Sequence, residues 1–480
     1  MVFRFCLFLF ILCASVLTNA QDTFAYDIKV KFKGIETSKN VQLAHYYGNA
    51  QFLKVDSAKA ENGIIRFKGT QGLQGGMYVI VLSPSVYYDF LISGTEPQIT
   101  IEADTSDFIN TVKFTGSKEN EILYNYRKYL ADKTKDAMEV QKVLRTSKEP
   151  LVLEENKRKM KAMQEEVNAY IKNTVKTHED TFAGKIIKIN MEPELPKEVP
   201  LLPSGKKDST FMYRTYKNKF FENVDFSDER MLKTPFIQNK VEKYFKDLVF
   251  QVTDSITTDA DRVLRLAQKH KDVYRFVLWM MSNKYENINV IGLDGVFVHL
   301  AENHYLKNAD WLDATQKAKF QERVDILKPI ITGKVMPLLI LQDTLGRDVN
   351  LMDIKSKYTL VYFYRYDCGH CQDHAPDLMK FYEENKDKGF AIYHAGTHET
   401  GDMKEELEKT KGFIKKYKTE KLINVLDLKL RYDFRKRYDV YKTPTIFLLD
   451  SEKRILAKSI PLEDVKGFVE FHEKQLAAKK

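Results

Sequence analysis

Cysteine is scarce in this sequence: there are four in 480 residues, and two of them, Cys6 and Cys13, lie within the first twenty. Only Cys368 and Cys371 remain in the rest of the chain, separated by two residues. So few thiols exclude a framework of structural disulfides. Two thiols at this spacing indicate either a redox pair or half of a metal site.

Long apolar segments are also absent beyond the N-terminus. Arg4 is followed by an apolar run over residues 5–17, and Thr18-Asn19-Ala20 then supplies the small side chains that a signal peptidase recognises. This pattern predicts a signal peptide over residues 1–20 and therefore export. No later run reaches the roughly 20 residues that a membrane helix needs, so we expect no transmembrane span in the mature chain.

A strong excess of charge of one sign is missing as well. The chain has 76 Lys and Arg against 67 Asp and Glu, a net charge of +9, and these residues are spread along its whole length. There is no basic arm or acidic tail, so we expect no nucleic-acid partner. The length and the apolar content of 43% suggest about three domains.

The first predicted domain is all-β. Ile28, Val30 and Phe32 alternate with lysines, which is the period of a half-buried strand. Further strand patterns follow up to residue 115, with Asn62-Gly63 suited to a tight hairpin turn. Residues 21–115 are therefore predicted to form a small β sandwich or barrel.

The second predicted domain, residues 116–332, is mostly α-helical. Ser117 can cap a helix whose apolar stripe begins at Ile122, and several amphipathic helices follow. Its one cluster of possible metal ligands is His299, Glu302 and His304. A five-residue offset separates two α-helical side chains by about 140°, so we expect no metal site there.

The third predicted domain, residues 333–480, alternates strands and helices as α/β folds do. Residues 358–364 are apolar enough for a buried strand. Helices are expected at 370–386, 403–417, 428–438 and 462–475, and further strands at 390–394, 424–426, 445–449 and 455–458.

The cysteines carry the chemistry of this domain. Cys368-Gly369-His370-Cys371 directly follows the strand and opens the next helix. Free backbone N–H groups and the helix dipole stabilise a thiolate at such a position, so we expect Cys368 to be the nucleophile, with help from protonated His370. Cys371, one turn further on, is predicted to be the more buried, resolving thiol.

Thr443-Pro444 stands just before another apolar strand, and here the sequence resembles the thioredoxin superfamily. The resemblance consists of strand, Cys-x-x-Cys, helix and then Thr-Pro before a strand. It implies a cis peptide at Thr443-Pro444 beside the redox pair, with backbone groups of Thr443 available to an extended substrate. It implies no metal or organic cofactor.

Within that superfamily, residues 333–475 resemble the exported TlpA and ResA type. The likeness includes the lead-in at 333–337 and the turn at 345–348. The two preceding domains resemble uncharacterised domains found ahead of such modules in Gram-negative bacteria, which implies the periplasm.

Three residues depart from the family pattern. Asp367 replaces the usual aromatic before the first cysteine, and its charge should raise the pKa of Cys368. Tyr362 stands where many thioredoxins keep a buried acid. His374 stands where ResA-like proteins often keep a glutamate, and its imidazole could serve as the base.

The leading hypothesis is therefore an exported thiol-disulfide oxidoreductase that acts on protein or peptide dithiols and disulfides and is reset by a membrane-bound redox partner. Two alternatives stay open. Cys368 and Cys371 with His374 or His394 could handle copper or zinc. The first two domains could instead form an envelope binding protein with an accessory redox module.

Overall fold

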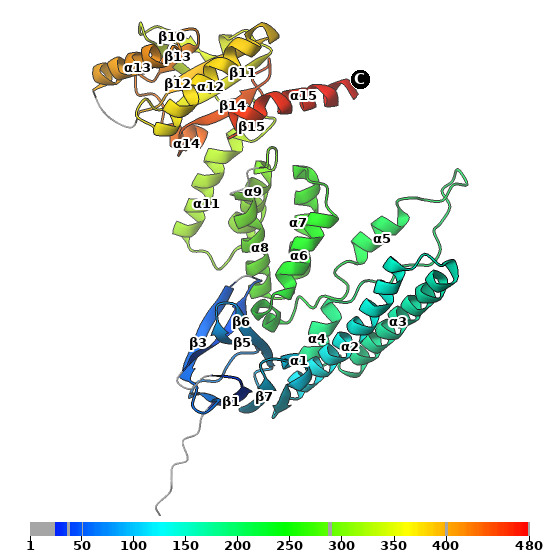
Figure 1. Ribbon diagram of the computed structural model, residues 1–480. Helices are drawn as coiled ribbons and strands as arrows, with labels where there is room; N and C mark the ends of the chain where they lie inside the picture. Colours follow the sequence, from blue (N-terminus) through cyan, green and yellow to red (C-terminus); the bar gives the residue numbers. More distant parts are fainter. Residues whose placement is uncertain (1–24, 36–38, 50, 287–289, 399–401, 479–480) are drawn as a thin grey trace, which may run out of the picture. The chain divides into compact units, whose positions relative to one another are not determined.

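The structure is a computed structural model that describes residues 25–35, 39–49, 51–286, 290–398 and 402–478 (Figure 1). The chain divides into two compact units, Met1–Asn239 and Lys240–Lys480. The predicted signal peptide lies outside the described residues. Every helix in the described part is too short or too polar to cross a bilayer.

The first unit begins with two four-stranded sheets in the described residues. One has the order β4 (Ile64–Gly69), β1 (Tyr26–Lys33), β7 (Gln98–Asp104), β8 (Lys113–Thr115). The other has the order β3 (Gln51–Lys59), β2 (Asn40–Tyr47), β5 (Gly76–Ser83), β6 (Val86–Ile92). Val30, Ile65 and Val79 are fully buried. The predicted β region with alternating burial is therefore present.

The Asn62-Gly63 segment is a tight hairpin turn, as predicted. Both residues have positive φ, 51° and 75°, as a tight turn requires. The strands on either side nevertheless belong to different sheets, because β3 pairs with β2 and β4 pairs with β1. Glu61 and Ile64 exchange both backbone hydrogen bonds across the turn, over 2.8 and 2.9 Å, and beyond this bridge the chain passes from one sheet to the other.

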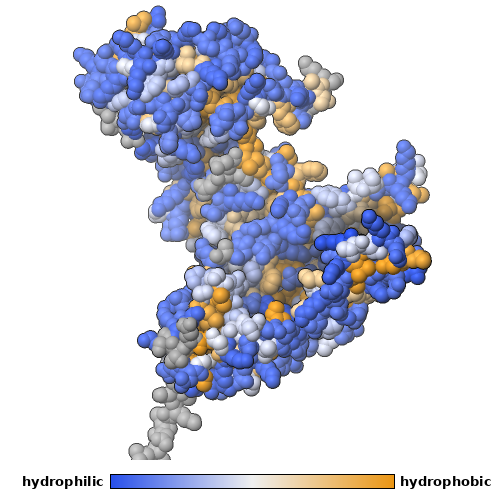
Figure 2. Space-filling model, in the orientation of Figure 1, coloured by the Kyte–Doolittle hydropathy of each residue, from blue (hydrophilic) through white to orange (hydrophobic). Residues whose placement is uncertain are grey.

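Exposed apolar side chains interrupt the hydrophilic surface of this β region (Figure 2). Phe52, Leu53, Val55 and Tyr87 are each 37–44% exposed, and the Phe52 and Tyr87 rings meet edge to face. The exposed Phe52–Tyr87 ring pair is a candidate contact site for another molecule.

Helices make up the rest of the first unit: α1 (Phe108–Thr111), α2 (Lys118–Thr146), α3 (Pro150–Thr177), α4 (Phe182–Ile189), α5 (Phe211–Lys219) and the 3-10 helix η1 (Glu229–Lys233). Ser117 caps α2 as predicted, because its side chain accepts a hydrogen bond from the N–H of Asn120.

Helices also open the second unit, after α6 (Phe236–Asp247) has crossed the boundary. They are α7 (Thr253–Ala267), α8 (Lys271–Glu286), α9 (Asp294–Leu300), the π-helix η2 (Ala301–Tyr305), α10 (Leu306–Asn308), α11 (Ala314–Leu327) and the 3-10 helix η3 (Lys328–Ile330). The π-helix was not predicted. It overturns the expectation that His299 and His304 face different directions, because a π-turn contains an additional residue.

A seven-stranded sheet forms the C-terminal part. Its order is β10 (Asp348–Asn350), β9 (Ile340–Asp343), β13 (Ile423–Leu426), β12 (Phe390–Gly396), β11 (Tyr358–Tyr364), β14 (Thr445–Leu449), β15 (Ile455–Lys458). All seven residues of β11 are buried. Leu360, Tyr362 and Tyr364 enter the core on one face of the sheet, and Val361 and Phe363 enter the core on the other. A central strand buried on both faces is typical of an α/β fold.

The helices of this part are α12 (Gly369–Asn385), α13 (Met403–Tyr417), α14 (Phe434–Tyr438) and α15 (Leu462–Ala478), with 3-10 helices η4 (Leu351–Asp353) and η5 (Lys386–Lys388). The helix predicted at 428–438 is wrong over its first half. Leu430 has a positive φ of 50°, and Asp433 caps α14 by accepting hydrogen bonds from two backbone N–H groups. The helix therefore begins only after Asp433.

Candidate active site

The two cysteines lie where the central strand gives way to a helix. β11 ends at Tyr364, and α12 begins directly after Cys368, its N-cap residue. β12 and β14 flank β11 on its two sides. Because the sheet holds the end of β11 in place, it also fixes the turn that carries Cys368, and Cys371 follows in the first helical turn.

Cys368 is the more accessible thiol of the pair. Burial would raise the pKa of this thiol, but hydrogen bonds from the Thr443 side chain, the Cys371 thiol and the backbone N–H groups of Cys371 and His370 outweigh it. The pKa of Cys368 is therefore lowered. These donors favour the thiolate because they stabilise negative charge on sulfur.

Cys371 is shifted in the opposite direction. Its side chain is only 1% exposed. Burial raises the pKa of the Cys371 thiol to about 12, and the neighbouring Cys368 contributes to the increase. When Cys368 is ionised, Cys371 is therefore still a neutral thiol that can donate a hydrogen bond to it.

Thr443 and Pro444 lie beside the pair. Their peptide bond is cis, as the resemblance implies. The neutral Cys368 thiol donates to the carbonyl oxygen of Thr443 over 3.3 Å. The two residues are far apart in sequence and meet because β14, which begins at Thr445, pairs with β11.

Asp367 is held by Arg365. Nε of Arg365 donates to Oδ1 over 2.9 Å and Nη2 donates to Oδ2 over 2.8 Å. This guanidinium lowers the pKa of Asp367. The pKa of Cys368 is lowered overall despite this neighbouring carboxylate.

The remaining predicted neighbours face solvent. Gly369, His370 and His374 are all exposed. Within the described part of the chain, the His374 side chain has no hydrogen-bond partner. Its role as a base stays a prediction.

Three buried rings lie on the strands behind the pair, and sequence analysis singled out only two of them. Tyr362 and Tyr364 of β11 have hydroxyl groups without a hydrogen-bond partner among the described residues. Burial raises the pKa of both, with a further contribution from Cys371. The ring of His394 on β12 stacks on Tyr364 at 3.7 Å, and burial lowers the pKa of His394 to about 4. His394 is therefore neutral and serves as packing.

The missed residue, Tyr364, carries a weak signal in the sequence. It occupies the same face of the strand as Tyr362 because side chains two residues apart in a strand share a face. That period alone could have placed it beside the pair.

Thr443 also lines a cleft of about 620 Å³. Its lining includes Arg365, His398, Tyr432, Tyr441 and Lys442. The Tyr441 side chain is 59% exposed. The cleft thus offers aromatic and cationic side chains next to Thr443.

The cysteines do not belong to a cluster of metal ligands. Groups of at least three close Cys, His, Asp or Glu side chains in the described part of the chain include neither Cys368 nor Cys371. His394, one of the candidate third ligands, is instead hydrogen-bonded through Nδ1 to Asn424 over 2.7 Å.

Family comparisons divide the chain in three. Residues 332–458 match the AhpC/TSA family. Residues 26–123 match a domain of unknown function, DUF4369, and residues 153–329 match another, DUF5106. Two uncharacterised domains therefore precede the C-terminal module.

Individual relatives are similar over that module. The chain is 27% identical over 147 residues to the thiol-disulfide oxidoreductase ResA of Bacillus cereus, a match that covers 29% of this chain and 76% of the relative. It is 35% identical to a solved domain of a possible thiol-disulfide isomerase from Cytophaga hutchinsonii, covering 31% of this chain and 98% of that one, with a TM-score of 0.29.

A third relative is the thioredoxin domain of a thiol-disulfide oxidoreductase from Bacteroides vulgatus. It is 34% identical, and the match covers 29% of this chain and 96% of that one, with a TM-score of 0.26. On the family match and the sequence identity together, the chain belongs to the thioredoxin-like thiol-disulfide oxidoreductases, with its AhpC/TSA family domain at residues 332–458.

Proposed function

We propose that this enzyme is exported and exchanges disulfides with protein or peptide substrates through Cys368 and Cys371. The observation that carries the proposal is the opposite displacement of two thiol pKa values within one helical turn: lowered at Cys368 and raised at Cys371. The Cys368 sulfur is thereby the nucleophile, and Cys371 is the resolving thiol, which stays protonated until the mixed disulfide has formed.

The exchange proceeds in two steps. The Cys368 thiolate attacks a substrate disulfide, so a mixed disulfide forms and one substrate thiolate leaves. Cys371 then loses its proton and attacks Sγ of Cys368, which releases the second substrate thiolate and leaves a Cys368–Cys371 disulfide. Both substrate sulfurs end as thiols, and the two electrons come from the cysteine pair. The reverse sequence oxidises a substrate dithiol.

Burial sets the order of these steps. Cys371 is shielded from substrate, so only Cys368 can meet an incoming disulfide. In the mixed disulfide Cys368 is no longer an anion, so the contribution of its charge to the raised pKa of Cys371 disappears. Cys371 then ionises more readily, and resolution follows attack.

A peptide substrate fits the surroundings. When Cys368 is ionised or disulfide-bonded, the Thr443 carbonyl loses the thiol that donates to it. It is then available to accept a hydrogen bond from a backbone N–H of an extended substrate. The adjacent cleft has room for the side chains of such a substrate.

Export rests on the predicted signal peptide at residues 1–20, and the periplasm of a Gram-negative bacterium is the proposed compartment. There a membrane-bound redox partner would return the pair to its starting state. The net direction, reduction or oxidation, depends on that partner and on the redox potential of the pair.

Trapping of mixed disulfides tests the proposal. In a Cys371→Ser variant the second step is blocked, so substrates should accumulate as reducible adducts on Cys368. The expected result is a set of covalent partners in envelope extracts, separated in the presence and absence of reductant and identified by mass spectrometry.

The matched controls are Cys368→Ser and the double variant, which should trap nothing. If the Cys371→Ser variant traps no partner while Cys368 still reacts with an alkylating reagent, a protein or peptide substrate is ruled out.

A further inference from the structure

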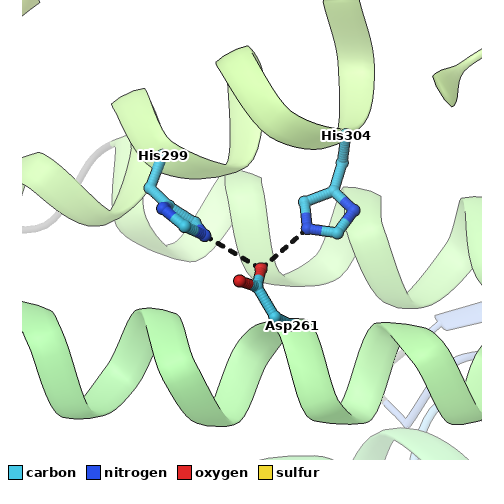
Figure 3. A group of neighbouring side chains, drawn as sticks. All are labelled: Asp261, His299 and His304. Carbon is cyan, nitrogen blue, oxygen red and sulfur yellow. Dashed lines mark hydrogen bonds and ion pairs between the residues drawn. The ribbon is translucent and has the colours of Figure 1, made fainter. Parts of the chain in front are cut away.

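Three side chains of the second unit converge on one point away from the cysteines (Figure 3). Asp261 projects from α7, His299 from α9 and His304 from η2. Nε2 of His299 lies 2.8 Å and Nε2 of His304 lies 2.9 Å from the same Oδ1 of Asp261. Two imidazole nitrogens and a carboxylate oxygen are therefore gathered in one place.

The π-helix produces this convergence. In η2, the N–H of Leu306 bonds to the carbonyl of Ala301, an i to i−5 contact. The additional residue in the turn brings side chains five positions apart back to one side of the helix. Single π-turns inside α-helices are frequent at functional sites.

These ligand types suit a divalent transition metal, since imidazole nitrogen and carboxylate oxygen are common zinc ligands. With metal–ligand bonds of about 2.0–2.2 Å in tetrahedral geometry, ligand atoms lie about 3.3 Å apart. The distances of 2.8 and 2.9 Å would have to open by only about 0.5 Å. All three ligand atoms lie within 4.8 Å of one another, so the change required of the side chains is small.

An outer contact already orients the ring of His304. The Tyr274 hydroxyl lies 2.9 Å from Nδ1 of His304, and the amide nitrogen of Asn303 lies 3.3 Å from Nδ1 of His299. When Nε2 binds a metal, Nδ1 carries the ring proton. The Tyr274 oxygen can accept a hydrogen bond from that N–H of His304, whereas the Asn303 oxygen already accepts one from Lys307. Partners of this kind hold imidazole ligands in place.

The cluster is open to solvent on one side. The side chains of Asp261, His299 and His304 are 38%, 28% and 10% exposed. An ion can enter without unfolding the helices, and three protein ligands leave one position for water. Glu302 takes no part, because it forms an ion pair with Lys328 at 2.7 Å.

We propose that Asp261, His299 and His304 form a binding site for a divalent transition-metal ion, zinc in the first instance, with water as the fourth ligand. The site uses neither cysteine and is independent of thiol-disulfide exchange. By joining α7 to the α9–η2 segment, bound zinc stabilises the helical part of the second unit by mass action.

Zinc binding is measured on residues 21–480 carrying Cys368→Ser and Cys371→Ser, so that no thiol competes for the metal. After equilibrium dialysis against zinc chloride, elemental analysis should give one zinc per chain, and zinc should raise the melting temperature. X-ray absorption should show nitrogen or oxygen ligands at about 2.0–2.1 Å with imidazole scattering.

Two ligand variants and one control locate the ion. His304→Ala and Asp261→Asn should each weaken zinc affinity by more than about 100-fold, beyond the 10–100-fold that loss of an outer partner costs. Glu302→Gln, on the same helical segment, should leave the affinity unchanged.

The proposal is overturned if the parent protein, residues 21–480 with both cysteines replaced by serine, retains no zinc. It is also overturned if both ligand variants are shown by circular dichroism to be folded and bind zinc as the parent does. Should the variants fail to fold, the parent's X-ray absorption decides, and zinc without imidazole ligands overturns the proposal.

Discussion

Two thiols on one helical turn differ because their surroundings differ. Cys368 is at the helix end, where backbone N–H groups and the Thr443 side chain reach its sulfur. Cys371 points into the core beneath the sheet, where burial outweighs the hydrogen bonds from the Arg365 backbone and the Thr443 side chain. The same sequence motif therefore produces one reactive and one protected sulfur.

The pH dependence of alkylation follows from the lowered pKa of Cys368. A thiolate is present above its pKa, so the reaction should stay fast as the pH falls below about 8.5, the value for free cysteine, and slow only near the lowered pKa. The Cys371→Ser variant provides a single reacting thiol, and iodoacetamide rates across a pH series give the midpoint. A midpoint at or above that of free cysteine contradicts the assignment.

The redox potential of the pair follows from the same shift. Stabilising the Cys368 thiolate stabilises the reduced form, so the potential should lie above the roughly −270 mV of thioredoxin. Equilibration of the wild-type protein with glutathione buffers measures it. A value at or below that of thioredoxin would show that the lowered pKa is offset in the disulfide form.

The unpartnered hydroxyl of Tyr362 predicts an unusual mutational result. A buried hydroxyl without a hydrogen bond costs about 1–3 kcal/mol, so Tyr362→Phe should leave the free energy of unfolding unchanged or raise it. Tyr438→Phe is the matched control, because the equally buried Tyr438 hydroxyl donates to Leu338 over 2.7 Å. That change should cost about 1 kcal/mol in urea unfolding. Equal losses in both variants would mean that Tyr362 has a bound water as partner.

At the scale of elements, Asn120 connects α2 to an edge strand. β6 lies at the end of its sheet, and there the Asn120 side chain accepts from the Leu91 N–H and donates to the Leu91 carbonyl, both over 2.7 Å. The side chain thus satisfies an edge that would otherwise present unpaired backbone groups.

Asn120→Ala should therefore lower the free energy of unfolding by about 2–4 kcal/mol, because two buried backbone groups of Leu91 lose their partners. Chemical denaturation measures the loss. Asn125→Ala, exposed on the same helix, should change the free energy by less than about 0.5 kcal/mol. Similar small effects for both would show that water replaces the Asn120 contacts.

Most helices and strands of the C-terminal part were predictable, and the exceptions have identifiable causes. The apolar run of β11 and the amphipathic pattern of α13 are local periodicities. The segment before α14 has a helical pattern, yet Leu430 adopts a positive φ there. The helix starts only after its N-cap residue, Asp433, and not at residue 428 as predicted. The π-turn at η2 likewise has no pattern that distinguishes it from an α-helix in sequence.

At the scale of the molecule, the redox part, residues 333–480, is in contact with helices that precede it in the second unit. Lys458 of β15 pairs with Asp294 at the start of α9 over 3.0 Å, and these side chains are only 17% and 13% exposed. Ile291 also packs against the core under the sheet. A fragment that begins at Gly333 loses both contacts.

Residues 240–480 should therefore fold alone and keep the Cys368 alkylation profile, whereas residues 333–480 should be less stable by about 1–3 kcal/mol, because Lys458 loses a charged partner. Urea unfolding of both fragments measures the difference. Asp294→Asn in the longer fragment isolates the ion pair. Equal stability of the two fragments would show that the helices contribute nothing to the redox part.

The boundaries 21–115, 116–332 and 333–480 remain predictions, as does the use of the first two domains to bind an envelope partner. The exposed apolar side chains near Phe52 and Tyr87 are the surface on which that binding would be sought.

The sequence by itself determined the redox pair, its position at a helix start and the order of β, α and α/β regions, because these are expressed by neighbouring residues through periodicity and helix-end chemistry. Only the tertiary structure decided that His394 stacks on Tyr364, that Arg365 pairs with Asp367 and that Asp261 meets two histidines. Those outcomes depend on burial and on side-chain contacts, most of them between residues far apart in the chain, which no local pattern records.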